Sequence, residues 1–297
     1  MYGTNSDKGY KVNRMSLRIG IDIGSTTVKV VLLDEQNKLL FRSYERHYSK
    51  ARERAAETLR SLADRLAGRQ VRIVITGSAG LGVAKAAEID FVQEVYAAAA
   101  AVNQYIPDTD AVIELGGEDA KIIFFGGALE ERMNGSCAGG TGAVIDQMAT
   151  LMNVTVNELD ELSLRHEKIY PIASRCGVFA KTDIQTLLNE GAAHEDIAAS
   201  VFQSVVNQTI SGLACGRPIR GKVAFLGGPL TFIPALRDRF QETLSIADED
   251  MIIPEHGELY VAIGAAVSAM HDRPLDLERG LSDVRKKTDV DLGSSKT

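Results

Sequence analysis

Two stretches of this sequence, far apart along the chain, repeat one strand–turn–strand pattern. In each copy an apolar run ends in an acidic residue, turns through glycine and resumes as a second apolar run. The acid and the lysine are seven residues apart in both copies, from Asp22 to Lys29 and from Glu114 to Lys121. Internal repetition indicates a duplicated unit. The sequence therefore predicts an α/β protein of two similar lobes, each opening with a β-hairpin directed at a common cleft.

The rest of the chain can be divided between these two lobes. Residues 1–16 are polar and lack the apolar core of a signal peptide, so we expect a disordered leader. Lobe I is expected to cover residues 17–105 and 258–271, and lobe II residues 106–257. The polar and aperiodic tail, residues 272–297, resembles a linker and suggests a longer parent protein.

Hydrophobic spacing predicts the elements around the hairpins. After the first hairpin it predicts a helix over 50–66, a small-residue loop over 76–80 and an alanine-rich helix over 91–104. After the second hairpin it predicts several helices and then a strand that ends at Gly227-Gly228. A helix over 233–244 is expected to follow.

The composition is that of a soluble protein in a reducing compartment. The 33 basic and 40 acidic residues leave a net charge of -7, without the basic stripe that nucleic-acid binding needs. The apolar runs are too short to span a bilayer. Three cysteines, an odd number, and no export signal argue against a disulfide framework and for the cytoplasm. We therefore expect neither a nucleic-acid nor a membrane partner.

The hairpin turns carry the residue types that hold a nucleotide. Glycine lets backbone N–H groups approach a phosphate closely, hydroxyl groups add donors, and a lysine neutralises phosphate charge. Acids at the strand ends can hold Mg²⁺ or orient a water. The candidate catalytic residues are Asp22, Glu114, Glu118 and Asp119, and the sequence does not choose which of the last three positions the attacking water. The candidate nucleotide-binding residues are Gly24, Ser25, Thr26, Thr27, Lys29, Gly116, Gly117, Gly139, Gly140, Gly227 and Gly228.

Two cysteines, Cys137 and Cys176, each lie in a glycine-containing turn just before a predicted helix. The positive end of the helix dipole and its unpaired N–H groups stabilise a thiolate there. Two thiolates do not complete a four-thiolate iron–sulfur site, whereas a symmetric dimer supplies four. Spacing alone favours the common alternative that both are small buried residues. Cys215 is interpreted as structural.

These segments resemble known ATPases. Residues 22–27 resemble the D-x-G-[ST]-[ST] hairpin of the actin/hexokinase/chaperone ATPase superfamily, which has duplicated ribonuclease-H-like lobes. Residues 114–119 resemble its second hairpin, and Gly227-Gly228 the segment that meets the adenosine. The turns at 134–142 and 174–188 resemble the cluster-binding stretches of the 2-hydroxyacyl-CoA dehydratase activators, a family that includes the ATPase subunits of benzoyl-CoA reductase.

The resemblance covers nearly all of residues 17–270 and implies a function. It implies a homodimer in which Cys137 and Cys176 of each subunit hold one bridging [4Fe–4S] cluster. It further implies that ATP, with Mg²⁺, drives a low-potential electron from ferredoxin or flavodoxin into a partner iron–sulfur dehydratase or reductase. Glu118, where relatives commonly carry glutamine, and the segment 254–258 depart from the smaller activators. They look more like the activator-type domain at the front of long multidomain relatives.

Two other functions fit parts of the pattern. A small-molecule kinase of the same superfamily would use the same cleft, with Asp119 as a possible base, but it leaves both cysteine turns unexplained. A non-catalytic module would use a degenerate nucleotide site only to assemble partners. A phosphorylated product without a cluster would favour the kinase, and failure to bind ATP would favour the module.

Overall fold

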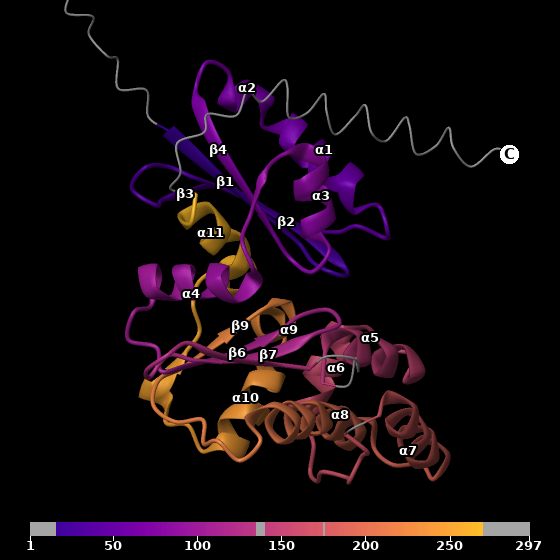
Figure 1. Cartoon of the computed structure of the whole chain (residues 1–297). Helices are drawn as coiled ribbons and strands as arrows, with labels where there is room; N and C mark the ends of the chain where they lie inside the picture. The colour runs from indigo at the N-terminus through magenta and orange to yellow at the C-terminus, as the bar shows by residue number, and fades with distance from the viewer. Residues whose placement is uncertain (1–15, 135–139, 175, 270–297) are drawn as a thin grey trace, which may run out of the picture.

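The structure, a computed structural model, describes residues 16–134, 140–174 and 176–269. The strands of these residues form two five-stranded sheets (Figure 1). The first sheet has the order β3-β2-β1-β4-β5, and the second has the order β10-β9-β6-β7-β8. Read from its other edge, the second order is β8-β7-β6-β9-β10, so corresponding strands occupy corresponding places.

The strand directions repeat as well. The first three strands of each half pair antiparallel, and the fourth and fifth add in parallel. The strands of the first sheet are β1 Ser16–Ile23, β2 Thr27–Leu33, β3 Leu39–Arg46, β4 Gln70–Thr76 and β5 Asp90–Phe91. Those of the second are β6 Ala111–Leu115, β7 Ala120–Phe124, β8 Glu130–Met133, β9 Val223–Leu226 and β10 Met251–Ile252. This duplicated topology confirms the predicted two-lobed, ribonuclease-H-like α/β fold.

The spacing of seven residues from acid to lysine in the sequence repeat places these two residues opposite each other when the strands pair. Asp22 lies opposite Lys29 across the β1–β2 hairpin, and Glu114 lies opposite Lys121 across the β6–β7 hairpin. Directly opposed side chains on one face of an antiparallel pair lie close enough to interact. Each hairpin therefore brings an acid and a lysine together at the same place in its lobe.

The two sheets are separated by the helices α4 Glu94–Tyr105 and α11 Tyr260–Val267, which lie between them in Figure 1. These helices share one apolar cluster with both sheets, and every residue of α11 is buried. On its other face the first sheet packs on α1 Ala51–Ser61 and α3 Gly80–Ala87. The second sheet packs on the helices α5 Gly142–Leu151, α6 Val156–Ser163, α7 Gly177–Asn189, α8 His194–Thr209 and α10 Pro234–Leu244.

Four local predictions differ from the structure. The helix expected over 50–66 breaks at Leu62 into α1 and α2 Ala63–Leu66. The loop expected over 76–80 leads directly into α3, which the periodicity missed. Phe91 belongs to the short strand β5, because it pairs with Ile75, and α4 begins only at Glu94. An extra helix, α9 Gly228–Phe232, precedes α10.

The helix α8 is continued by one turn of a different helical type. The segment η1, Ile210–Ala214, is a π-helix that continues α8. None of the helices in residues 16–134, 140–174 and 176–269 is both long enough and apolar enough to cross a membrane.

Candidate functional site

The turns of the two hairpins meet at the cleft between the sheets. Each turn is closed in the same way, by a hydrogen bond of 3.0 Å from the Gly24 N–H to the Thr27 carbonyl and one of 2.8 Å from the Gly116 N–H to the Asp119 carbonyl. A Cβ atom at Gly117 would collide with the Thr26 side chain of the other hairpin. Glycine at this position therefore lets the two lobes approach each other closely.

A small cavity of about 20 Å³ lies between the turns. This volume is enough for about one water molecule. The cavity gathers most of the residues that the sequence analysis selected: Asp22, Gly24, Ser25, Thr26, Thr27, Lys29, Glu114, Gly116, Gly117 and Asp119. The repeat in the sequence therefore corresponds to one place in the fold, contributed by both lobes.

Two larger cavities adjoin this central cavity. One, of about 210 Å³, shares Thr26, Thr27 and Gly117 with it and extends to Gly228. The other, of about 680 Å³, shares the side chains of Ser25, Ser78, Glu94, Asp119 and Lys121 with it. We call this second one the outer cavity. Each larger cavity thus shares lining residues of the hairpin turns with the central cavity, and we call the three together the row of cavities.

The first hairpin holds a buried ion pair. Lys29 Nζ lies 2.6 Å from Asp22 Oδ2, and Asp22 is 3% exposed. Burial alone lowers the pKa of Lys29, but the Asp22 carboxylate outweighs it and holds this pKa above its ordinary value. The lysine therefore stays charged throughout the neutral range, as a phosphate-binding cation must.

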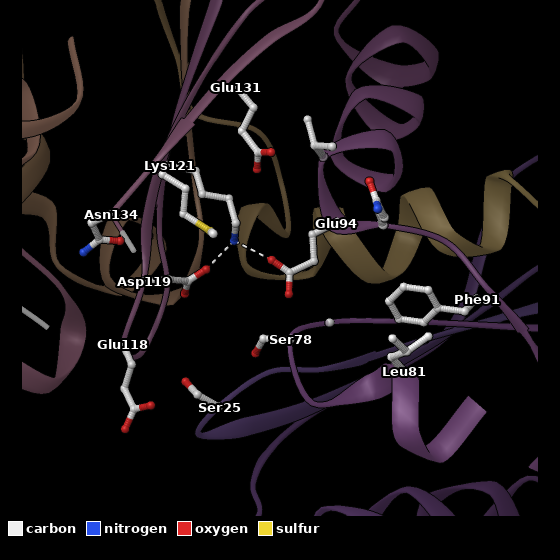
Figure 2. A pocket seen from close by; sticks show the side chains of 14 residues that line it. Ser25, Ser78, Leu81, Phe91, Glu94, Glu118, Asp119, Lys121, Glu131 and Asn134 are labelled. Atoms are coloured by element: carbon white, nitrogen blue, oxygen red, sulfur yellow. Dashed lines mark hydrogen bonds and ion pairs between the residues drawn. The ribbon is translucent and has the colours of Figure 1, made fainter. Parts of the chain in front are cut away.

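The second hairpin holds a larger network, and Figure 2 draws the contacts of Lys121 with Asp119 and Glu94 in it. Lys121 Nζ lies 2.6 Å from Glu94 Oε2, donates to Asp119 Oδ2 and lies 3.9 Å from Glu114 Oε1. Burial alone lowers the pKa of Lys121, but the three carboxylates outweigh it and hold this pKa well above its ordinary value. One buried ammonium group thus links the hairpin to the start of α4.

Glu114 is the most perturbed acid of the site. Burial raises the pKa of its carboxyl to about 7, although Lys121 acts in the opposite direction. Its Oε2 atom is buried and has no hydrogen-bond partner among the described residues. A carboxyl group with a pKa near neutrality in a cleft is a candidate for proton transfer.

The other predicted residues lie in different places. Glu118 is exposed and lines the outer cavity, apart from the Lys121 network (Figure 2). Gly227 has a φ of 87° and packs on the Leu115 backbone, where it caps α9. Gly140 packs against α8 and lines none of these three cavities. Gly139 and Cys137 lie outside the described residues.

Cys176 is the N-cap residue of α7, as its position before a predicted helix suggested. It is a half-buried free thiol. The next two side chains, Val178 at 72% and Phe179 at 65%, are among the most exposed large apolar groups of the described residues. Two exposed apolar side chains therefore follow this thiol in the first turn of α7.

The described residues of one chain do not form a metal site by themselves. No group of three or more His, Cys, Asp or Glu side chains in residues 16–134, 140–174 and 176–269 could hold a metal ion. A cluster on Cys176 would thus need ligands from outside this set, such as Cys137 and a second subunit.

Sequence reasoning missed two residues of the site. Glu94 carried no local signal, because it reaches the second hairpin only through the packing of α4 between the sheets. Lys121 was part of the sequence repeat but was not selected as a site residue. The equal spacing of acid and lysine in the two hairpins is the signal that would have identified it.

The duplicated lobes and the paired hairpin turns define an ATPase fold of the actin/hexokinase-like class. Within this class, the model of the BadF/BadG/BcrA/BcrD ATPase family matches residues 19–269, and the chain belongs to that family.

Individual relatives agree with this assignment. The 2-hydroxyisocaproyl-CoA dehydratase activator of Clostridioides difficile is 30% identical over 273 residues, which cover 86% of this chain and 95% of that protein. The crystal structure of component A of the Acidaminococcus fermentans (R)-2-hydroxyglutaryl-CoA dehydratase superimposes with a TM-score of 0.75 at 26% identity, covering 84% of this chain and 96% of that chain. The structure of the activator from Clostridium difficile with bound ADPNP gives 0.73 at 26% identity, covering 92% and 97%.

Proposed function

We propose that this protein is a cytoplasmic, ATP-dependent activator that delivers a low-potential electron to a partner iron–sulfur dehydratase or reductase. The observation that carries the proposal is the pair of matched hairpins around one cavity, in a chain of an ATPase family with a dehydratase activator among its relatives. The electron donor is a ferredoxin or a flavodoxin.

In this proposal the row of cavities holds Mg·ATP between lobe I (17–105 and 258–271) and lobe II (106–257). The hairpin turns supply backbone N–H groups and hydroxyls to the phosphates. Lys29 supplies a fixed positive charge beside them. Asp22 holds Mg²⁺ through water, and the Gly228 end of the row receives the adenosine. Carboxylates at the central cavity suit a cation that keeps most of its own waters.

The two cysteines hold a [4Fe–4S] cluster between two subunits. Cys176 suits this role because it lies at a helix N-terminus, where N–H groups can donate to cluster sulfur. The exposed Val178 and Phe179 suit a surface that a second subunit covers. Cys137 is the second ligand from each subunit. When bound, the cluster supplies a one-electron carrier of low potential.

The experiment that tests the cluster is anaerobic reconstitution with iron and sulfide. We expect about four irons per dimer, with the visible absorption of an iron–sulfur cluster. Cys137→Ala and Cys176→Ala should each lose the iron, whereas the matched control Cys215→Ala should keep it. ATP affinity should change by no more than a few-fold in all three variants. Correctly folded, ATP-binding wild-type protein without iron would contradict the proposal.

A small-molecule kinase is the second candidate, and one observation favours it. The outer cavity of about 680 Å³ adjoins the hairpin turns and is large enough for a small substrate beside a terminal phosphate. Its walls combine carboxylates with the apolar side chains of Leu81 and Phe91 (Figure 2), and Met133 also lines it. A phosphorylated small molecule formed from ATP by cluster-free protein would support this candidate over the activator.

A further inference from the structure

The second hairpin is anchored to the helix between the sheets through Lys121. This lysine is 3% exposed, and its ammonium group contacts Glu94 on α4 as well as Asp119 and Glu114 on its own hairpin. Removing one partner from a buried ion network leaves an uncompensated charge, which is strongly unfavourable. Lys121 Nζ is therefore fixed in one place beside the Glu114 carboxylate.

The sequence did not choose which of three acids positions the attacking water, and the structure shows that these acids differ in burial and in hydrogen bonding. Asp119 already accepts a hydrogen bond from Lys121, and Glu118 is exposed in the outer cavity. Glu114 lines the central cavity and keeps a buried oxygen, Oε2, without a partner among the described residues. A buried acceptor without a hydrogen bond is costly. A water molecule in the central cavity would supply the missing donor.

Resting on the proposed ATPase function, we infer that Glu114 accepts a proton from the attacking water and that Lys121, anchored by Glu94, is a positioning residue that holds Glu114 ionised for this step. The water oxygen bonds to the γ-phosphorus of ATP. The bond from this phosphorus to the bridging oxygen breaks, and ADP leaves with its electron pair. The water's proton passes to Glu114, which releases it to solvent after phosphate departs.

The charges around Glu114 determine the direction in which its pKa should change when one of them is removed, and this direction can be tested. Four charged groups face its carboxyl: Lys121 and Asp119 from its own hairpin, Glu94 from α4 and Lys29 from β2. Burial raises the pKa of Glu114, the lysines lower it, and the acids raise it further. Loss of Lys121 must therefore raise this pKa, whereas loss of Glu94 must lower it.

The test is the pH profile of ATP hydrolysis, with excess Mg²⁺, for Lys121→Met and Glu94→Gln. We expect the acid limb of the profile to move to higher pH by about one unit or more in Lys121→Met, because an opposite charge at this range shifts a carboxyl pKa by about that much. In Glu94→Gln the limb moves the opposite way. Lys121→Arg keeps it near the wild-type position. Glu131→Gln is the control, because Glu131 borders the outer cavity but is not among the four groups facing Glu114.

A second readout does not need turnover. The titration of Glu114 in nucleotide-free protein, followed by carboxyl NMR and assigned with Glu114→Gln, should show the same opposite shifts. The inference would be overturned if Lys121→Met and Glu94→Gln hydrolyse ATP more slowly while the acid limb of the pH profile and the titration of Glu114 stay at the wild-type pH. That result would leave the ATPase proposal intact. Wild-type protein that hydrolyses no ATP would overturn both. If Lys121→Met does not fold, Glu94→Gln and Lys121→Arg decide the outcome.

Discussion

The buried carboxyl of Glu114 makes the stability of the protein depend on pH in a predictable direction. Its pKa is about 7 in the folded protein, against an ordinary value of 4.5, so the folded state binds this proton more tightly than the unfolded state. The contribution is fully present below the unfolded pKa and is lost as the pH rises through the folded pKa. The difference of about 2.5 pKa units, at 1.36 kcal/mol each, amounts to about 3 kcal/mol.

The assay compares wild type with Glu114→Gln by urea unfolding of nucleotide-free protein. Between about pH 5 and about pH 8, the free energy of unfolding of wild type should fall by about 2–3 kcal/mol relative to the variant. Glu118→Gln removes an exposed carboxylate from the same turn and serves as the control: because it keeps Glu114, its free energy of unfolding should fall with pH as that of wild type does. A difference between wild type and Glu114→Gln that stays constant, or that grows with pH, would show that the pKa of Glu114 is not raised in the folded protein.

Three further predictions follow from packing and charge. Gly117→Val should lower ATP affinity at least about tenfold by calorimetry while the protein stays folded, because its side chain would collide with Thr26 where the turns meet. Phe202→Ala should cost about 3–5 kcal/mol in urea unfolding, since Phe202 is fully buried in the second lobe's core. Arg46→Ala should cost less than about 1 kcal/mol in the same assay, because its 2.7 Å ion pair with Asp146 is largely exposed and water screens it.

The sequence alone was sufficient to predict the fold and to select residues that meet at one cavity, because both depend on local patterns. The acid–glycine–lysine repeat predicted two hairpins, and the same spacing proved to be the register that opposes Asp22 to Lys29 and Glu114 to Lys121. Most of the residues chosen from the hairpin turns line one cavity for the same reason. The register of such a hairpin is determined by its local sequence, through the hydrophobic pattern and the length of the turn.

The remaining parts of the site depend on packing between distant elements. Glu94 reaches Lys121 because α4 packs between the sheets, a placement that no local pattern encodes. The choice of Glu114 over Glu118 and Asp119 also needed the structure, because all three acids lie in one short segment and only burial and partners distinguish them. Short elements such as β5 and α9 were missed because they offer too few residues for a periodic signal.

The proposed activator couples ATP hydrolysis in the interlobe cleft to electron transfer. The most direct test mixes the reconstituted, reduced protein anaerobically with a 2-hydroxyacyl-CoA dehydratase of the kind that its relatives activate, and follows the one-electron reduction of that acceptor by EPR. We predict reduction with Mg·ATP and none with ADPNP or without nucleotide. Equal reduction under all three conditions, or ATP hydrolysis with no reduction of the acceptor, would show that ATP hydrolysis does not drive electron transfer in this protein.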